Sequence, residues 1–387
     1  MTNKIQLFHF NNGSGGGVLS VIRNLVQYRQ HAEIEHHIIY TINKDLHSSF
    51  SAPVIAGVVS TQVFYYSANW NFYVTAKKLA ALLPSKEAVI VAHDWLELGA
   101  CSNLGLQNPV VYFAHGDYEY YYELAIKNQQ VIDRFIAVAQ NISDQLQLRI
   151  PERTKDILYR RFPVPEAIGH QKDFPPTLNV VFIGRLTEMK GYPMLPGIAQ
   201  QLNSSGYKLN WHIVGDNAKV KLPVWDKHIA VKFYGELPND NVRELLRNMH
   251  LLLLPTLAEG MPLVLIEAMK AGVVPLVNDL PGGIRELVVD GTTGYKIQGN
   301  EPEIYVEKIS SLYHQHDLLK ELAANAAAHA QHLFEPVKNT RLIEDVLITA
   351  MRNAARKPAV KVYGSRLDQS WLPNIITKTI RKFGVGK

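Results

Sequence analysis

Cysteine is almost absent from this sequence, since Cys101 is the one cysteine among 387 residues. A single thiol excludes an internal disulfide and any metal site built from several cysteines, which is typical of a reducing cytoplasm. No apolar run reaches the roughly 18 residues of a membrane-spanning helix. The opening MTNKIQLFHF lacks a basic segment followed by a cleavable apolar one. We therefore expect a soluble, cytoplasmic chain without an export signal.

Positive charge is scarce outside the C-terminal tail, although the formal net charge is +5. Residues 352–387 hold nine Lys or Arg and one acid, so the rest of the chain has a net charge of −3. A body with a small negative charge does not favour binding to nucleic acid. We expect no nucleic acid partner.

Short apolar, β-rich runs alternate with helical patterns along the whole chain. Several of these runs are apolar on both faces, as strands of a buried parallel sheet are. With 47% hydrophobic residues, a chain of this length can fill two cores. The pattern predicts two doubly wound α/β domains. The runs that predict strands are 5–10, 35–42, 88–93, 109–115, 134–139, 178–184, 210–215, 230–235, 250–255 and 272–277.

A proline-rich segment separates two halves that each open with a strand, a glycine turn and a helix. The segment FPVPEAIGHQKDFPP, residues 162–176, carries four prolines and no periodicity, so we interpret it as a hinge. We predict Rossmann-like domains over 1–165 and 166–350, followed by a basic tail over 351–387. If the domains face each other, the carboxyl ends of both sheets border one interdomain cleft.

The stretch EGMPLVLIE places two acids, Glu259 and Glu267, around the start of a predicted helix. Pro262 suits the first helical position and Gly272 a left-handed cap, which predicts a helix over 262–271. Its free backbone N–H groups and partial positive charge favour an anion. An anion flanked by hydroxyl-bearing groups, as in a nucleotide sugar, fits this layout. The same sequence is explained equally well by a purely structural alternative, in which one Glu caps the helix and the other lies on its solvated face.

Two cations follow the first strand of the second half. In GRLTEMKG, Arg185 and Lys190 flank a turn that leads into a helix, where their side chains can reach a phosphate over the strand ends. Arg supplies a planar fork and Lys a movable point charge, which together suit a diphosphate. Taken in isolation, the motif is more often a pair of surface cations.

Five ordered motifs carry a family resemblance. Their order and spacing resemble those of the retaining glycosyltransferases of family 4, which have the GT-B fold. The resemblance implies two facing Rossmann-like doubly wound domains with an interdomain cleft, the N-terminal one on the acceptor side and the C-terminal one binding the nucleotide sugar. The motifs are GRLTEMKG, IVGD (213–216), VKFYG (231–235), PTLAEGMPLVLIEAMKAG (255–272) and PGGIRELVVDGTTGY (281–295).

The resemblance also implies roles for single residues. In similar enzymes the basic pair, here Arg185 and Lys190, binds the donor diphosphate, and the second acid, here Glu267, holds the ribose hydroxyls. Pro262 departs from the family pattern, which often has Gly there, and it removes one amide from the loop. The implied contacts with the transferred sugar are Glu259, Gly260, Met261 and Leu263.

The first half contributes the glycine-rich loop NNGSGGGV. Gly15 and Gly16 allow the backbone to approach a phosphate at a helix start, and relatives have a Gly-Gly pair there that covers the diphosphate. A dinucleotide site is less favoured, because Val18 replaces the third glycine of G-x-G-x-x-G and YTIN (40–43) supplies no acid. A flexible loop is the remaining alternative.

His115 follows a strand that is expected to be buried, so it lies at the carboxyl end of that strand. Relatives have a His at this position beside the transferred sugar, whereas a lone His is more often structural. His93 also ends a strand, but nothing else in the sequence converges on it. A run of tyrosines after His115 can either pack an acceptor or form an aromatic helix face against the core. These are Tyr118, Tyr120, Tyr121 and Tyr122.

These patterns predict a retaining hexosyltransferase that moves a sugar from a UDP- or GDP-sugar to a glycan or lipid-linked acceptor, in cell-surface polysaccharide or glycolipid synthesis. Retention follows from the resemblance. No cofactor and no metal are expected, because cations and helix amides can stabilise the leaving diphosphate. A nucleotide-sugar epimerase or hydrolase and a non-catalytic nucleotide-sugar-binding subunit are the alternatives. The predicted catalytic residues are Glu259, His115, Arg185 and Lys190.

The C-terminal segment SWLPNIITKTIRKF, residues 370–383, has the pattern of an amphipathic helix. Its basic residues lie away from the apolar stripe, which allows peripheral binding to an anionic membrane surface, here the inner face of the cytoplasmic membrane. Docking on the first domain explains the same stripe, and the sequence favours neither alternative. The stripe consists of Leu372, Ile375, Ile376, Ile380 and Phe383.

Overall fold

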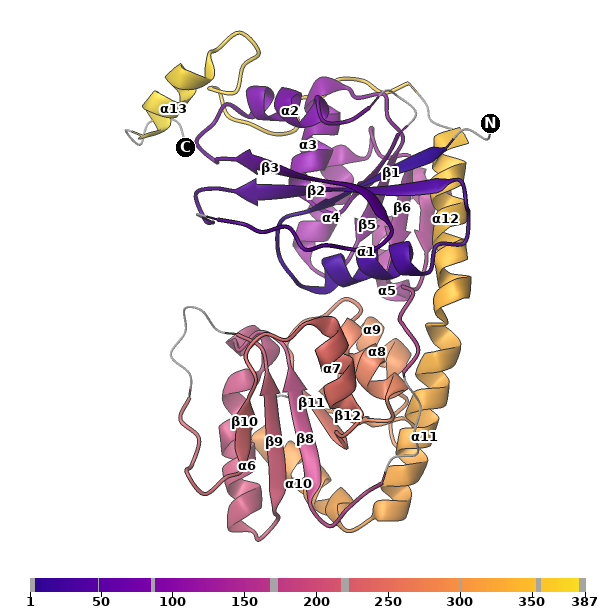
Figure 1. Cartoon of the computed structure of the whole chain (residues 1–387), viewed down its shortest axis with the longest axis vertical. Coiled ribbons are helices and arrows are strands. Elements are labelled where there is room, and N and C mark those ends of the chain that lie inside the picture. Colours follow the sequence, from indigo (N-terminus) through magenta and orange to yellow (C-terminus); the bar gives the residue numbers. More distant parts are fainter. Residues whose placement is uncertain are drawn as a thin grey trace. The chain divides into compact units, whose positions relative to one another are not determined.

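The computed structural model describes residues 4–47, 49–84, 88–167, 173–216, 223–299, 301–352 and 356–382. The chain divides into two units. The first combines residues 1–163 with 337–387, and the second is the continuous stretch 164–336. Figure 1 labels most of the helices and strands of both units.

The first unit is built on a parallel sheet whose strands run in the order β3-β2-β1-β4-β5-β6-β7. The chain winds outward from β1 in both directions, which is the doubly wound arrangement. The strands are β1 (Ile5–Asn11), β2 (Ile34–Asn43), β3 (Val58–Tyr66), β4 (Val89–Ala92), β5 (Val110–Ala114), β6 (Arg134–Ala137) and β7 (Ile157–Tyr159). The helices are α1 (Gly17–Gln27), α2 (Phe72–Ala80), α3 (Trp95–Leu104), α4 (Glu119–Asn128), α5 (Gln140–Arg149), η1 (Pro151–Asp156), α12 (Pro336–Arg352) and α13 (Asn374–Lys382).

The second unit repeats the arrangement with the strand order β10-β9-β8-β11-β12-β13, again parallel throughout. Its strands are β8 (Leu178–Ile183), β9 (Leu209–Val214), β10 (Val231–Phe233), β11 (Leu251–Leu254), β12 (Val274–Asn278) and β13 (Tyr295–Ile297). Its helices are η2 (Glu188–Lys190), η3 (Tyr192–Met194), α6 (Leu195–Ser204), α7 (Asn239–Leu246), α8 (Leu263–Lys270), α9 (Gly283–Leu287), α10 (Pro302–Tyr313) and α11 (His316–Leu333).

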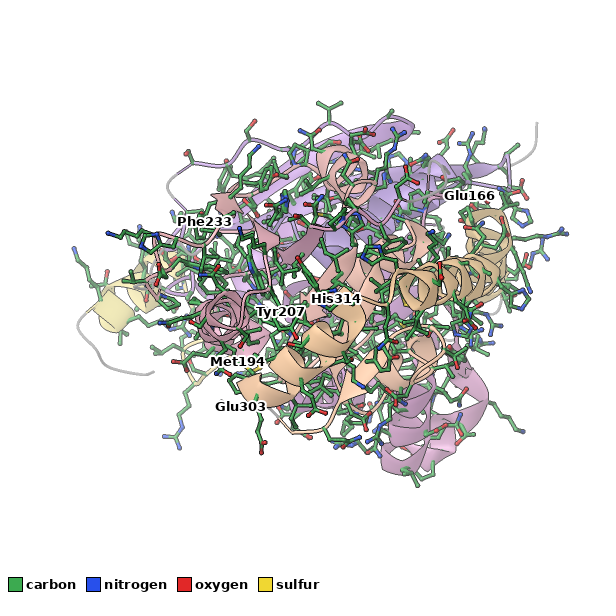
Figure 2. The ribbon with its side chains drawn as sticks, turned by 90° about the horizontal axis from the view of Figure 1, so that it is seen from below. Glu166, Met194, Tyr207, Phe233, Glu303 and His314 are labelled. Atoms are coloured by element: carbon green, nitrogen blue, oxygen red, sulfur yellow. The ribbon has the colours of Figure 1, made fainter. Side chains whose placement is uncertain are left out.

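Continuous apolar runs form the centre of each sheet. Every residue of β4, β5, β11 and β12 is buried, which requires a strand that is covered on both faces. Aromatic residues complete the packing at the periphery of the second unit, where the rings of Tyr207 and His314 have centroids 6.1 Å apart (Figure 2). The predicted class, two doubly wound α/β sheets, is confirmed.

All the strands predicted from the sequence are present, and three further strands join them. β7 and β13 are each three residues long, too short for a periodic signal. β3 is the edge strand of its sheet, and its residues are only partly buried. Short length and an edge position do not prevent prediction in every case, because β10 has both and was predicted from the run 230–235.

The boundaries between the units differ from the predicted ones. The first falls at 163/164, close to the predicted 165/166 and inside the predicted hinge, of which residues 168–172 lie outside the described residues. The second falls at 336/337 rather than 350/351. Helix α12 belongs to the first unit from Val337 onward because the Glu344 carboxylate accepts the backbone N–H groups of Gln30 and His31, at 3.1 and 3.0 Å.

The tail packs on the first unit. Lys357 forms a buried ion pair with Asp133, 2.6 Å between Nζ and Oδ2, and Val360 N–H donates to Ser102 O at 2.7 Å. Of the two alternatives for the tail, docking on the first domain is present, while membrane binding stays a prediction. Phe383, the last residue of the predicted stripe, lies outside the described residues.

Candidate active site

The turn after β8 is fixed against the loop after β11. Met189 O accepts the backbone N–H of Leu257 at 2.9 Å and the hydroxyl of Thr256 at 3.2 Å. Gly191 has a φ of 72°, and a Cβ there would lie 1.9 Å from Pro255 O. Only glycine permits so close an approach of two backbones, so the turn and the loop form one support.

This support brings Lys190 and Glu259 together. The ammonium of Lys190 lies 2.5 Å from Oε1 of Glu259, and the two side chains are only 18% and 11% exposed. Arg185, at the start of the same turn, is exposed and has no ion pair with any residue that the structure describes. One cation is therefore held by a predicted sugar-binding acid, and the other remains available.

The loop that carries Glu259 is fixed from the other side by β12 and α9. Asn278 donates to Thr256 O at 3.0 Å, and the Tyr305 hydroxyl donates to Asn278 Oδ1 at 2.9 Å. Gly283 N–H donates to Gly260 O at 3.1 Å, and a Cβ on Gly283 would lie 2.2 Å from that oxygen. The loop therefore has a defined path into α8.

Helix α8 begins at Leu263, with Pro262 as its N-cap, one residue later than predicted. The amide of Leu265 makes a hydrogen bond with Pro262 O, so the amide of Leu263 lies ahead of the first bonds inside the helix. Met261, which precedes Pro262 in the loop, is buried. Gly272 follows the helix with a φ of 67°, the predicted left-handed cap. The helix start thus offers backbone donors but lacks the amide that proline removes.

Glu267 lies on α8 next to a cavity of about 300 Å³ between α7 and α8. Burial raises the pKa of Glu267 to about 7, and the nearby cations Arg243 and Lys270 oppose this shift. Lys270 donates to Val164 O at 2.7 Å and to Phe334 O at 2.9 Å. The cavity is lined by Pro165, Glu166, Ala167, Asp240, Arg243, Glu244, Arg247, Glu267, Lys270 and Ala271.

In the first unit, Gly15 and Gly16 are exposed in the loop that follows β1. Gly16 is the N-cap of α1, and a Cβ built on it would meet no atom within 4 Å. The backbone is therefore open at the start of this helix. Because β1, β4 and β5 are parallel neighbours, the loops after them share one edge of the sheet.

His115 and His93 form a hydrogen-bonded pair at that edge. Nδ1 of His93 lies 2.8 Å from Nε2 of His115. Burial lowers the pKa of His115 to about 3, and burial, then His115, lowers the pKa of His93 well below its ordinary value. Both rings are therefore neutral near pH 7. The expectation that nothing converges on His93 was wrong, and its place at the end of the strand beside β5 was the available signal.

The four tyrosines after His115 divide between surface and core. Tyr122 is buried and donates to Asp117 at 2.5 Å. Tyr120 is exposed and donates to Asp94, and the ring of Tyr121 meets that of His115 edge-on, with centroids 6.2 Å apart. The sequence suggested one shared role for the four tyrosines, either packing an acceptor or packing against the core. Their different exposures show that they do not share one environment.

The predicted site residues fall into two groups, one in each unit. The second unit places Lys190 against Glu259 and puts Gly260, Met261 and Leu263 on the same fixed loop. The first unit holds Gly15, Gly16 and His115 at one sheet edge. The meeting of the two groups across a cleft stays a prediction, as do the roles of these residues.

The part of the chain that the structure describes contains neither a metal-binding cluster nor a membrane-spanning helix. Among the residues that the structure describes, no group of three or more His, Cys, Asp or Glu side chains is arranged to hold a metal ion. Each helix within the described ranges is too short or too polar to cross a bilayer.

Residues 170–329 match the sequence model of the family described as Glycosyl transferases group 1. An uncharacterized glycosyltransferase of Methanocaldococcus jannaschii is 23% identical over 329 residues, which cover 80% of this chain and 88% of that protein. A glycosyltransferase of Salmonella typhimurium, provisionally assigned to colanic acid biosynthesis, is 24% identical over 184 residues, 44% of this chain and 45% of that protein. The match thus spans less than half of the second relative.

The crystal structure of the Anabaena protein HepE in complex with UDP-glucose is similar in fold. The TM-score is 0.70 at 17% identity, and the superposition covers 89% of this chain and all of that one. The similarity shows the fold, two Rossmann-like parallel-sheet domains of the GT-B kind. The family match over residues 170–329 confirms the resemblance of the sequence to glycosyltransferases.

Proposed function

We propose that this chain, whose residues 170–329 match the sequence model of the group 1 glycosyl transferases, moves a hexose from a UDP- or GDP-sugar to a glycan or lipid-linked acceptor with retention at the anomeric carbon. The proposal rests chiefly on one observation, the contact of Lys190 with Glu259 beside the start of α8. Cation, acid and helix amides there converge within the second unit. A nucleotide-sugar donor is further supported by HepE, which holds UDP-glucose.

The donor diphosphate lies at the start of α8 in this proposal. Arg185 is exposed and provides a two-pronged contact, while Lys190 has three N–H donors and can bind a phosphate and Glu259 at once. As the bond to the sugar breaks, negative charge builds on the diphosphate, and these fixed groups stabilise it. The reaction therefore needs no metal ion.

The two acids hold the two ends of the donor. Glu267 accepts hydrogen bonds from the ribose hydroxyls. The neighbouring cavity of about 300 Å³ binds the base. This volume lies at the small end of the range for ligand pockets. Glu259 and the backbone from Gly260 to Leu263 contact the hexose. From the first unit, His115 donates to the transferred sugar, and the bare backbone at Gly15 and Gly16 covers the diphosphate.

The relative assigned to colanic acid biosynthesis supports a role in cell-surface polysaccharide or glycolipid synthesis. An acceptor of this kind is a growing glycan or its lipid-linked form. The chemistry at the anomeric carbon is the same for both, because only the attacking hydroxyl changes.

A thermal-shift screen of the full chain against UDP-, GDP-, ADP- and CMP-sugars tests the proposal. We expect one nucleotide to stabilise the chain, and Arg185→Ala to abolish that shift because the diphosphate loses its charge-assisted contact. Arg341→Ala, which removes another exposed arginine, is the matched control. Unchanged nucleotide affinity in Arg185→Ala would contradict the site. Isomerised or free sugar formed without acceptor would favour an epimerase or hydrolase instead.

A further inference from the structure

Helix α13 docks on the first unit through its polar side. Thr377 is buried, and its hydroxyl donates to a backbone carbonyl at 3.2 Å. Arg381 donates to Trp70 O at 2.5 Å and to Asp368 at 2.6 Å. Asp368 also accepts the backbone N–H of Phe72 at 2.5 Å. These contacts hold α13 near the start of α2 (Figure 1).

The other side of α13 leaves large apolar side chains in solvent. Ile375 is 73% exposed, Ile376 is 43% exposed, and Trp371, just before the helix, is 75% exposed. Ile375 lies at the edge of the predicted stripe, where helical spacing puts it on the same side as the exposed Lys378 and Lys382. The expectation that the basic residues lie away from the stripe therefore does not hold at Ile375. An amphipathic helix that only completes a fold buries its apolar stripe. Helix α13 instead buries a threonine and exposes isoleucines.

The surface around these side chains is basic. Lys77 and Lys78 are exposed on α2. The ammonium groups of Lys44 and Lys78 lie 4.4 and 5.3 Å from the ring centroid of Trp70, whose carbonyl anchors α13. Neither α2 nor α13 contains an acidic residue. The lysines of these two helices therefore meet no carboxylate from either helix, while Asp45, which follows Lys44, accepts hydrogen bonds from the Ser67 hydroxyl and the Ala68 N–H.

We infer that Trp371, Ile375 and Ile376, together with the lysines of α2 and α13, form a lipid-docking surface for an anionic bilayer. The apolar side chains enter the boundary between headgroups and acyl chains, while the lysines stay with the lipid phosphates. Tryptophan suits this boundary because its ring is apolar and its N–H is polar. A nucleic acid would engage the lysines but leave the isoleucines in water.

The lipid-docking surface does not depend on the donor site. It belongs to the first unit and contains none of the residues assigned to the nucleotide sugar. Its benefit to the cell rests on the proposed function, since binding to a bilayer brings the chain to a lipid-linked acceptor. The two proposals can therefore fail separately.

Co-sedimentation of the full chain with vesicles tests this surface. We expect binding to mixed phosphatidylserine–phosphatidylcholine vesicles and little binding to phosphatidylcholine alone. Lys378→Gln and Lys382→Gln should each weaken binding about fivefold. Ile375→Asp should weaken it about tenfold or more, because it removes an apolar side chain that enters the bilayer and adds a negative charge that the anionic lipids repel.

Matched controls come from elsewhere in the first unit. Leu148 on α5 is 74% exposed, so Leu148→Asp makes the same change at an equally exposed apolar position. Lys155→Gln removes an exposed lysine from η1. Both controls should bind vesicles as the wild type does. Circular dichroism melts of all variants should coincide, because every substituted side chain is exposed.

Two outcomes would overturn the inference. One is a wild-type chain that does not bind anionic vesicles. The other is binding that falls with the lysine variants but not with Ile375→Asp, since such adsorption needs only charge. Donor-induced thermal shifts should be the same in all of these variants, so a chain that binds nucleotide sugar but not vesicles refutes the surface and leaves the proposed function standing.

Discussion

At the scale of single residues, the proposed ligand-binding position of Glu267 carries a cost to the stability of the fold. Burial raises the pKa of its carboxyl group from 4.5 to about 7. Between these values the folded chain keeps a proton that the unfolded chain releases, so stability falls as the pH rises through this window. An acid retained at such a position is typical of binding sites, where function and stability conflict.

Replacing this acid should therefore stabilise the chain and weaken donor binding. Above pH 7, Glu267→Gln should unfold at a higher temperature than the wild type, by about 2–4 °C for each kcal/mol regained, and the difference should shrink toward pH 4.5. Nucleotide affinity should fall about tenfold, because an amide cannot accept charge-assisted bonds. Calorimetry across pH and titration calorimetry measure the two effects. Glu307→Gln, at an exposed position on α10, should change neither.

The pair of His93 and His115 has a defined proton arrangement. In a neutral pair one ring donates and the other accepts. Nε2 of His93 is buried without a hydrogen-bond partner among the described residues, and a buried N–H without an acceptor is rarer than an unpaired acceptor. His93 therefore donates through Nδ1–H, and His115 carries its own proton on Nδ1. His115 can then donate to a sugar oxygen but cannot act as a base.

This arrangement can be read by NMR of the histidine ring nitrogens in the full chain. We expect His115 to be protonated at Nδ1 in the wild type and in His93→Asn, because the amide of asparagine can donate in place of Nδ1–H. In His93→Asp the carboxylate accepts instead, so the proton of His115 should move to Nε2. An Nε2-protonated His115 in the wild type would refute the assignment.

At the scale of secondary-structure elements, glycines decide how loops meet. Gly191 and Gly283 carry close backbone contacts that place the 184–191 turn and the start of α8. Both glycines are visible in the sequence, but the sequence does not show which strand or loop each glycine contacts. Lys190 and Glu259 are 69 positions apart, and only the pairing order of β8, β11 and β12 brings them together.

Gly283→Ala tests whether α9 positions the loop that carries Glu259 and Gly260. The new methyl group would overlap Gly260 O, so the loop must shift, at a cost of about 1–3 kcal/mol. We expect a large loss of nucleotide affinity in titration calorimetry with the secondary structure intact. Gly197→Ala on α6 meets nothing within 4 Å and should be neutral or stabilising by up to about 1 kcal/mol. Equal affinities in both variants would show that Gly283 does not position the loop.

At the scale of the whole molecule, the two units differ in how many segments of the chain they contain. The second is one continuous stretch, whereas the first requires its last residues to return after the second is complete. The return is secured by the buried ion pair of Lys357 and Asp133. Loss of one partner of a buried pair leaves an uncompensated charge.

Lys357→Ala should therefore destabilise the first unit selectively, by about 3–5 kcal/mol. Hydrogen exchange followed by mass spectrometry should show faster exchange in peptides from β4 to β6 and unchanged exchange in peptides from β8 to β12. Lys361→Ala, which removes a neighbouring exposed lysine, should leave both patterns as they are. Equal acceleration in both units would show that the pair does not secure the first unit alone.

The sequence by itself determined the fold class and the resemblance to a glycosyltransferase family, which the family model matches over residues 170–329. Buried strands are apolar along their whole length and glycine turns are local, so both can be read from neighbouring letters, as with β11 and with the turn at Gly191. The proposed site residues Glu259, Glu267, Arg185 and Lys190 were predicted in the same way, because each lies in a short ordered motif.

Tertiary structure decided what depends on distant pairing. The partnership of His93 with His115 needs β4 and β5 side by side, and the attachment of α12 needs Glu344 to reach Gln30 across the chain. The side of α13 that faces solvent is likewise set by Asp368 and Trp70 rather than by its own apolar stripe. Periodicity reports which residues share a face of a helix, but only the packed neighbours determine where that face points.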